Sequence, residues 1–140
     1  MGTTARAAKG DDAADVFVMV CDFATSYVPD AEAFAATFQG ALHGEAGALL
    51  LAEEAGEIAG YVLASQAPTF FANGPVTEVL ELYVKLTFRR TGVCRALVEQ
   101  VAGAARDRGS VEVTVPTRRV GDFYRALGFD ATAEFYKRKL

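Results

Sequence analysis

Residues 82–96 read LYVKLTFRRTGVCRA, and the rest of the sequence is interpreted outward from this stretch. The apolar run up to Val84 predicts the end of a strand, and a helix is expected to begin at Val93. The turn between them contains Arg89 and Gly92. The first turn of a helix has unpaired N–H groups at the positive end of its dipole, and glycine lets a ligand approach the backbone. The stretch therefore predicts a phosphate or pyrophosphate site, with an ordinary strand–helix turn and solvated arginines as the alternative.

Length and composition favour one globular domain over residues 1–140. Hydrophobic residues make up 51% of the chain and charged residues 23%, which excludes disorder as the main state. No apolar run approaches the roughly 18 residues of a membrane helix. Cys21 and Cys94 lie far apart and His43 is the single histidine. We therefore expect no metal site, no membrane partner and a reducing, cytoplasmic location.

Charge is distributed unevenly along the sequence. Residues 1–86 contain twelve acidic and three basic residues, whereas residues 87–140 contain six acidic and eleven basic residues. A basic half suits an anionic partner and an acidic half suits a cationic one. Since the overall net charge is −4, a small polyphosphate cofactor fits this pattern better than nucleic acid, and no nucleic-acid partner is expected.

The order of the expected elements favours an α/β fold. Two helices precede a β-meander, and strands then alternate with helices, which predicts a mixed, mostly antiparallel sheet with helices on both faces. The expected elements are a strand at 3–8, helices at 12–25 and 31–42, strands at 48–53, 58–66 and 76–84, a helix at 93–106, a strand at 111–115, a helix at 119–127 and one or two strands within 129–140.

Three segments in this order carry a family resemblance. Residues 89–94 read RRTGVC after the strand ending LYV, residues 51–62 read LAEEAGEIAGYV, and residues 123–129 read FYRALGF. The sequence resembles the GNAT superfamily of acetyl-CoA-dependent N-acetyltransferases. The resemblance implies a central sheet of six to seven strands in which two neighbouring strands splay apart to admit the cofactor. Cys94 stands where the family usually has Gly or Ala, and Arg90 and Thr91 replace a common Gly-Lys pair.

The same resemblance implies an acetyl-CoA site. The N–H of Leu82 would face the acetyl carbonyl and stabilise the developing oxyanion, the N–H of Val84 would hold the pantetheine, and the amides of residues 90–95 would hold the pyrophosphate. The implied cofactor-binding residues are Leu82, Tyr83, Val84, Arg89, Arg90, Thr91, Gly92, Val93, Cys94, Arg95, Thr117, Phe123 and Tyr124.

An amine acceptor also needs a base, and the leaving thiolate benefits from an acid. Glu78 lies four residues before Leu82, so a regular strand places both side chains on one face. Glu78 is the preferred base, Glu81 on the opposite face is its competitor, and either could act through a water. A surface carboxylate is the alternative for Glu78. The resemblance implies that Tyr124 is the acid, with a packing role as its alternative.

Aromatic side chains are the candidates for lining an acceptor pocket. Tyr27, Phe34, Phe70 and Phe71 are considered for this role, with core or interface packing as an equal alternative. A cap or surface role is favoured over catalysis for His43.

The leading function is transfer of acetyl from acetyl-CoA to a primary amine, preferably of a small cationic molecule, by direct attack. A protein amine stays open as acceptor. The alternative is a non-catalytic acyl-CoA-binding or sensing domain. A glyoxalase-like metal enzyme, suggested by FYRALGF alone, lacks the histidines and the repeat that it needs. Exposed strand edges are compatible with a homodimer.

Overall fold

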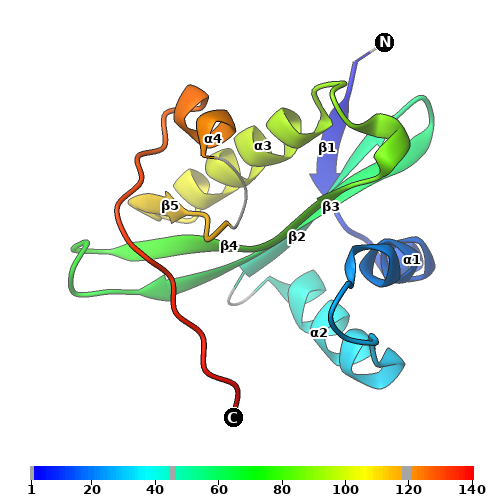
Figure 1. Ribbon diagram of the computed structural model, residues 1–140, viewed down its shortest axis with the longest axis horizontal. Helices are drawn as coiled ribbons and strands as arrows, with labels where there is room; N and C mark the ends of the chain where they lie inside the picture. Colours follow the sequence, from blue (N-terminus) through cyan, green and yellow to red (C-terminus); the bar gives the residue numbers. More distant parts are fainter. Residues whose placement is uncertain (1, 45–46, 118–120) are drawn as a thin grey trace.

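The computed structural model describes residues 2–44, 47–117 and 121–140. A mixed sheet runs through the molecule, with α1 and α2 on one side and α3 and α4 on the other (Figure 1). The elements are β1 Thr4–Ala7, the 3₁₀ helix η1 Gly10–Asp12, α1 Ala13–Phe23, α2 Ala31–His43, β2 Gly47–Glu54, β3 Glu57–Pro68, β4 Pro75–Val84, the 3₁₀ helix η2 Leu86–Phe88, α3 Val93–Asp107, β5 Glu112–Thr114 and α4 Asp122–Ala126.

The strands of the sheet follow one another in chain order from β1 to β5. Strands β1 to β4 are antiparallel neighbours, and β5 lies parallel to β4. A parallel neighbour requires a crossover connection, and the segment carrying α3 provides it. This is the mixed α/β architecture that the sequence predicts.

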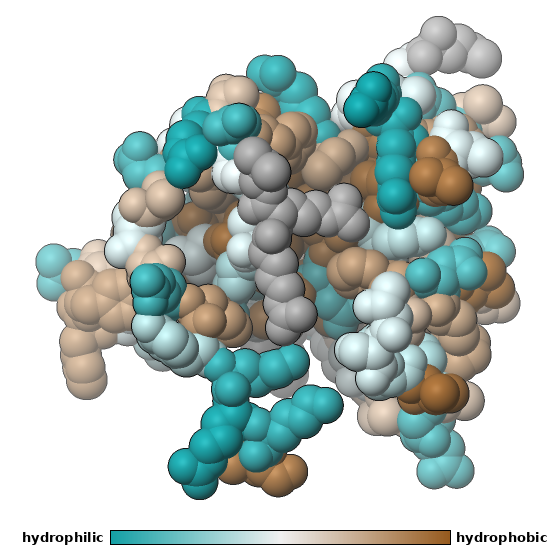
Figure 2. Space-filling model, viewed as in Figure 1, coloured by the Kyte–Doolittle hydropathy of each residue, from teal (hydrophilic) through white to brown (hydrophobic). Residues whose placement is uncertain are grey.

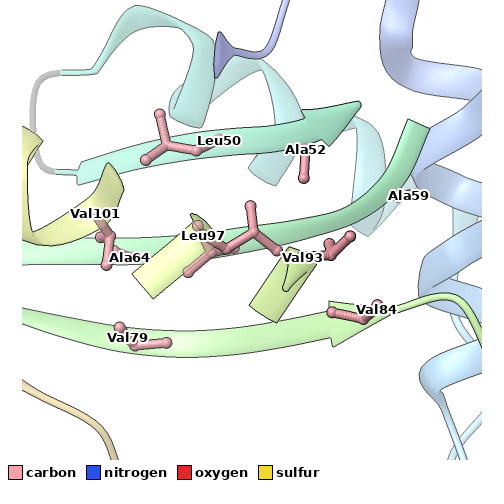
Figure 3. Close-up of a cluster of buried hydrophobic side chains, with 10 residues drawn as sticks. Leu50, Ala52, Ala59, Ala64, Val79, Val84, Val93, Leu97 and Val101 are labelled. Carbon is pink, nitrogen blue, oxygen red and sulfur yellow. The ribbon is translucent and has the colours of Figure 1, made fainter. Parts of the chain in front are cut away.

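The face covered by α3 contains the first of two apolar clusters. Five buried side chains of α3 recur at helical spacing, and Figure 3 shows Val93, Leu97 and Val101 over the strands. They meet alternate residues of β2, β3 and β4, among them Val62 and Val84. The strong amphipathic period of this segment therefore fixes which side of α3 faces the sheet.

The opposite face of the sheet forms the second cluster with α1 and α2. Met19 of α1 and Phe38 of α2 pack against Leu51 and Tyr61. Asp30 caps α2, since its carboxylate accepts a hydrogen bond of 2.8 Å from the N–H of Ala33. The two helices therefore cover the alternate residues of the same strands that α3 leaves uncovered.

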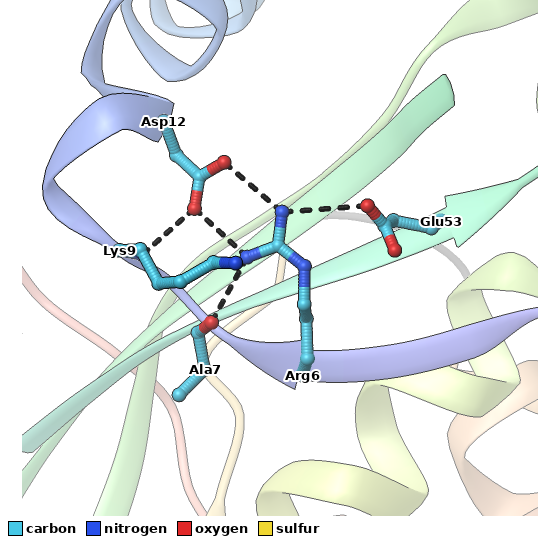
Figure 4. Close-up of polar contacts among 5 residues, drawn as sticks. All are labelled: Arg6, Ala7, Lys9, Asp12 and Glu53. Atoms are coloured by element: carbon cyan, nitrogen blue, oxygen red, sulfur yellow. Dashed lines mark hydrogen bonds and ion pairs between the residues drawn. The ribbon is translucent and has the colours of Figure 1, made fainter. Parts of the chain in front are cut away.

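A polar network fixes the start of the chain to the sheet. The Arg6 guanidinium donates to both oxygens of the Asp12 carboxylate at 2.8 and 3.0 Å, and more distantly to Glu53 on β2 at 3.4 Å (Figure 4). The N–H of Lys9 donates to the same carboxylate at 2.7 Å. Asp12 is buried, so these donors compensate for its lost hydration.

The end of the chain differs from the prediction. Residues 129–140 form neither a helix nor a strand, and nearly all are exposed. Figure 2 shows the last part as a hydrophilic arm that stands away from the rest of the molecule. The expected final strands are therefore wrong, and the sheet within the described ranges has five strands rather than six to seven. A strand needs the edge of another strand as its partner. The edge strand β5 has only three residues, and Pro116, which has no N–H to donate, follows shortly after its end.

The last helix is shorter than expected. It covers Asp122–Ala126 rather than residues 119–127, and the predicted start at Arg119 and Val120 lies outside the described residues. Gly128 follows it with φ +89°, as its predicted role in closing the helix requires.

Candidate active site

The partnership between β4 and β5 is confined to one end of β4. Their register covers Val76 with Glu112, Thr77 with Val113, and Glu78 with Thr114. Residues 79–84 of β4, apart from Leu80, pair with β3 but have no partner on β5. The two strands therefore part after Glu78, and no strand of the described residues pairs with that edge of β4 beyond this point.

A β-bulge lies at the point where the strands separate. On the β3 side, Leu63 faces Glu81 and Ala64 faces Val79, so Leu80 is an extra residue on β4. Such a residue interrupts the two-residue alternation of side chains. Val79, Leu82 and Val84 all pack in the cluster under α3. Glu78, next to Val79, consequently faces the side of α1 and α2.

This bulge corrects the predicted arrangement of the two glutamates. A regular alternation of side chains predicts that Glu78 and Leu82 share one face of the strand and that Glu81 lies on the opposite face. In the structure Glu78 and Glu81 share the face of α1 and α2, and the side chain of Leu82 lies on the other face. Both carboxylates therefore remain candidates for the base, on the same side of the sheet.

The free edge of β4 presents backbone donors. The N–H of Lys85 donates to the carbonyl of Ala59 on β3 at 2.8 Å. Because successive residues of a strand direct their N–H groups to opposite edges, the N–H groups of Leu82 and Val84 face away from β3. The carbonyl of Val84 is directed the same way and accepts a 3.0 Å hydrogen bond from Nε of Arg89. These are the two amides that the sequence predicts for acetyl and pantetheine binding.

The loop after β4 forms an open, positively charged mouth at the start of α3. Gly92 precedes the helix with φ +91°, and a Cβ on this residue would meet no atom within 4 Å. The first hydrogen bond of the helix runs from the N–H of Ala96 to the carbonyl of Gly92, so the amides of residues 93–95 lack helical partners. Exposed arginine side chains surround this mouth: Arg89, Arg90 and Arg95.

The other predicted cofactor residues lie on α3, on β4, after β5 and on α4. Cys94 is half-buried and packs against the cluster under α3. Tyr83 directs its ring to the opposite face, 5.4 Å from that of Phe23. Thr117 is exposed after β5. On α4, Tyr124 lies between the rings of Phe123 and Phe129, at centroid distances of 5.2 and 5.7 Å.

A cavity of about 230 Å³ lies between the helices α1 and α2 and the sheet. Glu81 reaches it from β4, and the hydroxyl of Tyr61 donates a 2.7 Å hydrogen bond to that carboxylate. Burial, reinforced by the charge of Glu81, raises the pKa of Tyr61 far above its ordinary value. Tyr61 therefore stays a neutral donor that orients Glu81.

Two of the aromatic residues considered for an acceptor pocket line this cavity. Tyr27 and Phe34 do so, and burial followed by the charge of Glu81 raises the pKa of Tyr27. Phe70 and Phe71 instead lie exposed near the tip of the β3–β4 hairpin. Sequence reasoning missed Tyr61, because its position opposite Tyr83 depends on the pairing of β3 with β4.

The described residues contain neither a metal-binding cluster nor a membrane-length helix. No group of three His, Cys, Asp or Glu side chains there is arranged to hold a metal ion. None of the helices found in the same ranges is long and apolar enough to cross a membrane. Cys21 and Cys94 form no disulfide.

Comparisons with known proteins bear on the family and the fold. The model of the acetyltransferase (GNAT) family matches residues 15–129. A search of curated proteins finds no sequence that matches this chain. Among solved structures, AAC(6')-Iy in complex with the bisubstrate analogue CoA-S-monomethyl-acetylneamine is 21% identical over 100% of both chains, with a TM-score of 0.83.

Two further solved structures share the fold. Glucosamine-6-phosphate N-acetyltransferase from Arabidopsis thaliana is 17% identical over 99% of both chains, with a TM-score of 0.83. An acetyltransferase from Trypanosoma brucei is 18% identical over 99% of both chains, with a TM-score of 0.81. At these identities the likeness shows the fold alone.

Proposed function

Because the chain belongs to the GNAT acetyltransferase family, we propose that it transfers an acetyl group from acetyl-CoA to the primary amine of a small cationic molecule by direct attack. The observation that carries this proposal is the unpaired edge of β4 beyond Glu78, which opens beside the mouth at Gly92. A strand edge with outward N–H groups and an open helix start provide backbone donors for a long, thin, anionic ligand.

The described residues fit acetyl-CoA at both ends. The mouth at Gly92 is open, and Arg90 and Arg95 add positive charge around the unpaired amides for a diphosphate. The outward N–H groups of Leu82 and Val84 continue the row of donors along β4. Acetyl-CoA supplies the activated acetyl thioester. The N–H of Leu82 is the donor that would stabilise negative charge on the acetyl oxygen, an effect of about 3–4 kcal/mol for a well-placed group.

The acceptor would enter from the face of α1 and α2. The cavity there reaches β4 at Glu81, the residue directly before Leu82. Its acidic lining residues are Asp30 and Glu81, and no Lys, Arg or His of the described residues lines it. An ammonium group is therefore attracted to the side of the sheet from which it can attack the thioester carbon.

Proton transfer requires a base for the ammonium group and an acid for the thiolate. We assign Glu78 as the base and Tyr124 as the acid, with Glu81 as the competing base. Glu78 shares a face with Glu81, which points to a proton path along this side of β4 through a water. The Glu81 carboxylate already accepts the Tyr61 hydrogen bond, which suits it to holding the ammonium.

The first experiment measures thermal unfolding with and without acetyl-CoA, followed by thiol release with a panel of amines. A ligand at one hundred times its Kd adds about 2.7 kcal/mol of stability. Stabilisation together with amine-dependent thiol release supports the proposal. Stabilisation without thiol release for any amine supports the alternative, a non-catalytic acyl-CoA-binding domain. The absence of stabilisation at millimolar acetyl-CoA contradicts both.

Single substitutions then assign the roles. We expect Glu78→Gln and Tyr124→Phe each to lower kcat by roughly 10²-fold or more, the usual effect of losing a general base or acid. Glu99→Gln and Tyr136→Phe, at exposed positions of α3 and the tail, are the matched controls. Unchanged kcat in Glu78→Gln together with a loss in Glu81→Gln would transfer the role of base to Glu81.

A further inference from the structure

The cavity beneath α1 and α2 has walls that are apolar for most of their area. Its aliphatic and aromatic side chains come from both helices, from β2 and from β3, while its polar atoms belong to a few residues near β4 and the start of α2. The apolar lining residues are Val16, Val20, Pro29, Ala33, Phe34, Phe38, Ala41, Leu49 and Leu63, and the polar ones are Tyr27, Asp30, Thr37, Tyr61 and Glu81.

The charged groups of the cavity are the carboxylates of Glu81 on β4 and Asp30 before α2. Tyr61 donates to Glu81 at 2.7 Å, and the carboxylate has further lone pairs for an ammonium group. Asp30, the second acid, already accepts the N–H of Ala33 as the cap of α2. The rings of Tyr27 and Tyr61 lie on the same cavity, and aromatic faces attract cations. The pair of Tyr61 and Glu81 therefore provides a place for an ammonium group at the β4 end.

The apolar walls, which make up most of the cavity, cannot satisfy a polar body. A hydroxyl group placed against the valine, leucine and phenylalanine walls loses its hydrogen bonds to water without gaining others. A volume of about 230 Å³ is also below the range of about 300–1,000 Å³ that accommodates drug-sized ligands. Sugar amines with several rings and many hydroxyls are therefore poorly matched in both size and polarity.

We infer that the acceptor is a small primary amine with an apolar body, such as one aromatic ring or a short alkyl chain joined to the ammonium group. This inference rests on the proposed acetyl transfer and narrows its acceptor. The ammonium group binds Glu81, the apolar body fills the space between Phe34, Phe38 and Leu63, and the nitrogen comes next to Leu82, where the acetyl group is offered.

The test compares 2-phenylethylamine with glucosamine and neamine at saturating acetyl-CoA. We expect kcat/KM for 2-phenylethylamine to exceed the values for both sugar amines by roughly 100-fold, the scale on which apolar pockets discriminate. A higher kcat/KM for either sugar amine would overturn the inference while leaving the acetyltransferase proposal intact.

Matched substitutions on α2 locate the binding of the body. Ala33 and Ala36 are both exposed positions of this helix, but only Ala33 lines the cavity. We expect Ala33→Leu to raise KM for 2-phenylethylamine by about tenfold through lost space, and Ala36→Leu to leave it within about twofold. Equal effects of the two substitutions would contradict the assignment of the cavity.

A binding measurement separates this inference from the failure of the proposed function. Calorimetric titration of the full chain with 2-phenylethylamine needs no acetyl-CoA and no turnover. Binding that Glu81→Gln weakens by about tenfold supports the cavity assignment even if no amine releases thiol. No binding and no turnover with 2-phenylethylamine, in a chain that acetyl-CoA still stabilises, would overturn the inference.

Discussion

Gly92 takes a backbone conformation that other residues adopt only with strain. Its φ is +91°, and the space beside its α-carbon is open for 4 Å. Arg90, two residues earlier, takes φ +66° without being glycine, and left-handed backbone disfavours a residue with a side chain by roughly 1–2 kcal/mol. Strain and open space thus coincide in the loop that we assign to the diphosphate, as is common at ligand sites.

We predict that Gly92→Ala weakens acetyl-CoA binding roughly tenfold or more, since a methyl group would occupy the approach to the amides. It should also lower the free energy of unfolding by about 1 kcal/mol because of the positive φ. Gly103→Ala in α3 is the control, with open space and no positive φ, and it should raise stability by up to about 1 kcal/mol. Calorimetry and urea unfolding check both. Equal acetyl-CoA affinity in the two variants would contradict the loop assignment.

Asp12 makes the free energy of unfolding depend on pH in the acidic range. The hydrogen bond from Arg6 holds the pKa of Asp12 below its ordinary value of 3.8, against the opposing effect of burial. A lowered pKa in the folded state contributes stability that is complete well above pH 3.8 and is lost as the pH falls through the folded pKa.

We predict that Asp12→Asn lowers the free energy of unfolding at pH 7 by about 1.5–3 kcal/mol, the range for hydrogen bonds to a charged group. The difference in free energy of unfolding between the two chains should shrink as the pH falls below 4. Protonation of Asp12 then removes the ionised pair from the unsubstituted chain. Asp11→Asn, in the same turn but exposed, should have little effect. Urea midpoints at pH 7, 4 and 3 test this, and a difference that does not change with pH would contradict the role of the ionised pair.

At the scale of elements, the sequence predicts those parts whose pattern is local. The amphipathic period of α3, the central hairpin and the strand before Gly92 all appear within a few residues of their expected places. Apolar burial and turn residues decide these elements, and both can be read from neighbouring positions.

Three features needed information that neighbouring residues do not carry. The bulge at Leu80 places Glu78 with Glu81, and nothing in the run TEVLEL (77–82) marks the position of the extra residue. The alternation of Phe129, Ala131 and Ala133 favours a strand, but a strand depends on a partner edge elsewhere in the chain. Tyr61 was missed for the same reason, since its partner Glu81 lies across the hairpin.

The bulge itself is open to test by deletion. Removing Leu80 would leave Glu81 opposite Leu63 and Val79 opposite Ala64, so both faces keep their side chains while the local bend is lost. We predict a folded chain whose kcat/KM falls by roughly 100-fold, because the N–H of Leu82 is then aimed differently.

Leu80→Ala is the matched control for this deletion. The side chain of Leu80 is 51% exposed, so the substitution keeps the bulge and loses little packing. Its kcat/KM should stay within about threefold of the unsubstituted value. Circular dichroism establishes that both variants fold. A folded deletion variant with unchanged kcat/KM would show that the bulge does not position the reaction.

Across the whole molecule, the sheet separates the two kinds of charge that the sequence places in its two halves. The cavity takes all its lining residues from positions 16–81, in the acidic half. The arginines at the mouth of α3 come from positions 89–95, in the basic half. The anionic and the cationic substrate that we propose would therefore approach different sides of β4, each attracted by charge of the opposite sign.

Salt dependence tests this separation at the level of the whole protein. Arg95 and Arg106 are both exposed on α3, and their separation of eleven residues corresponds to about 16 Å along a helix. That distance exceeds the Debye length of about 8 Å at 0.15 M salt. Arg106→Gln therefore removes the same charge as Arg95→Gln, but at the end of the helix remote from the mouth.

We predict that at about 0.1 M salt, where the Debye length is about 10 Å, Arg95→Gln raises KM for acetyl-CoA by about three- to tenfold, whereas Arg106→Gln changes it by less than about twofold. The effect of Arg95→Gln should diminish as salt is added, because screening removes the attraction that the substitution removes. KM for the amine should change little in either variant, since its cavity lies across the sheet. Steady-state kinetics from 0.02 to 0.5 M salt, roughly the range over which the Debye length falls severalfold, measure both constants. Equal effects of the two substitutions on KM for acetyl-CoA would mean that net charge, rather than the mouth at Gly92, attracts the anionic substrate.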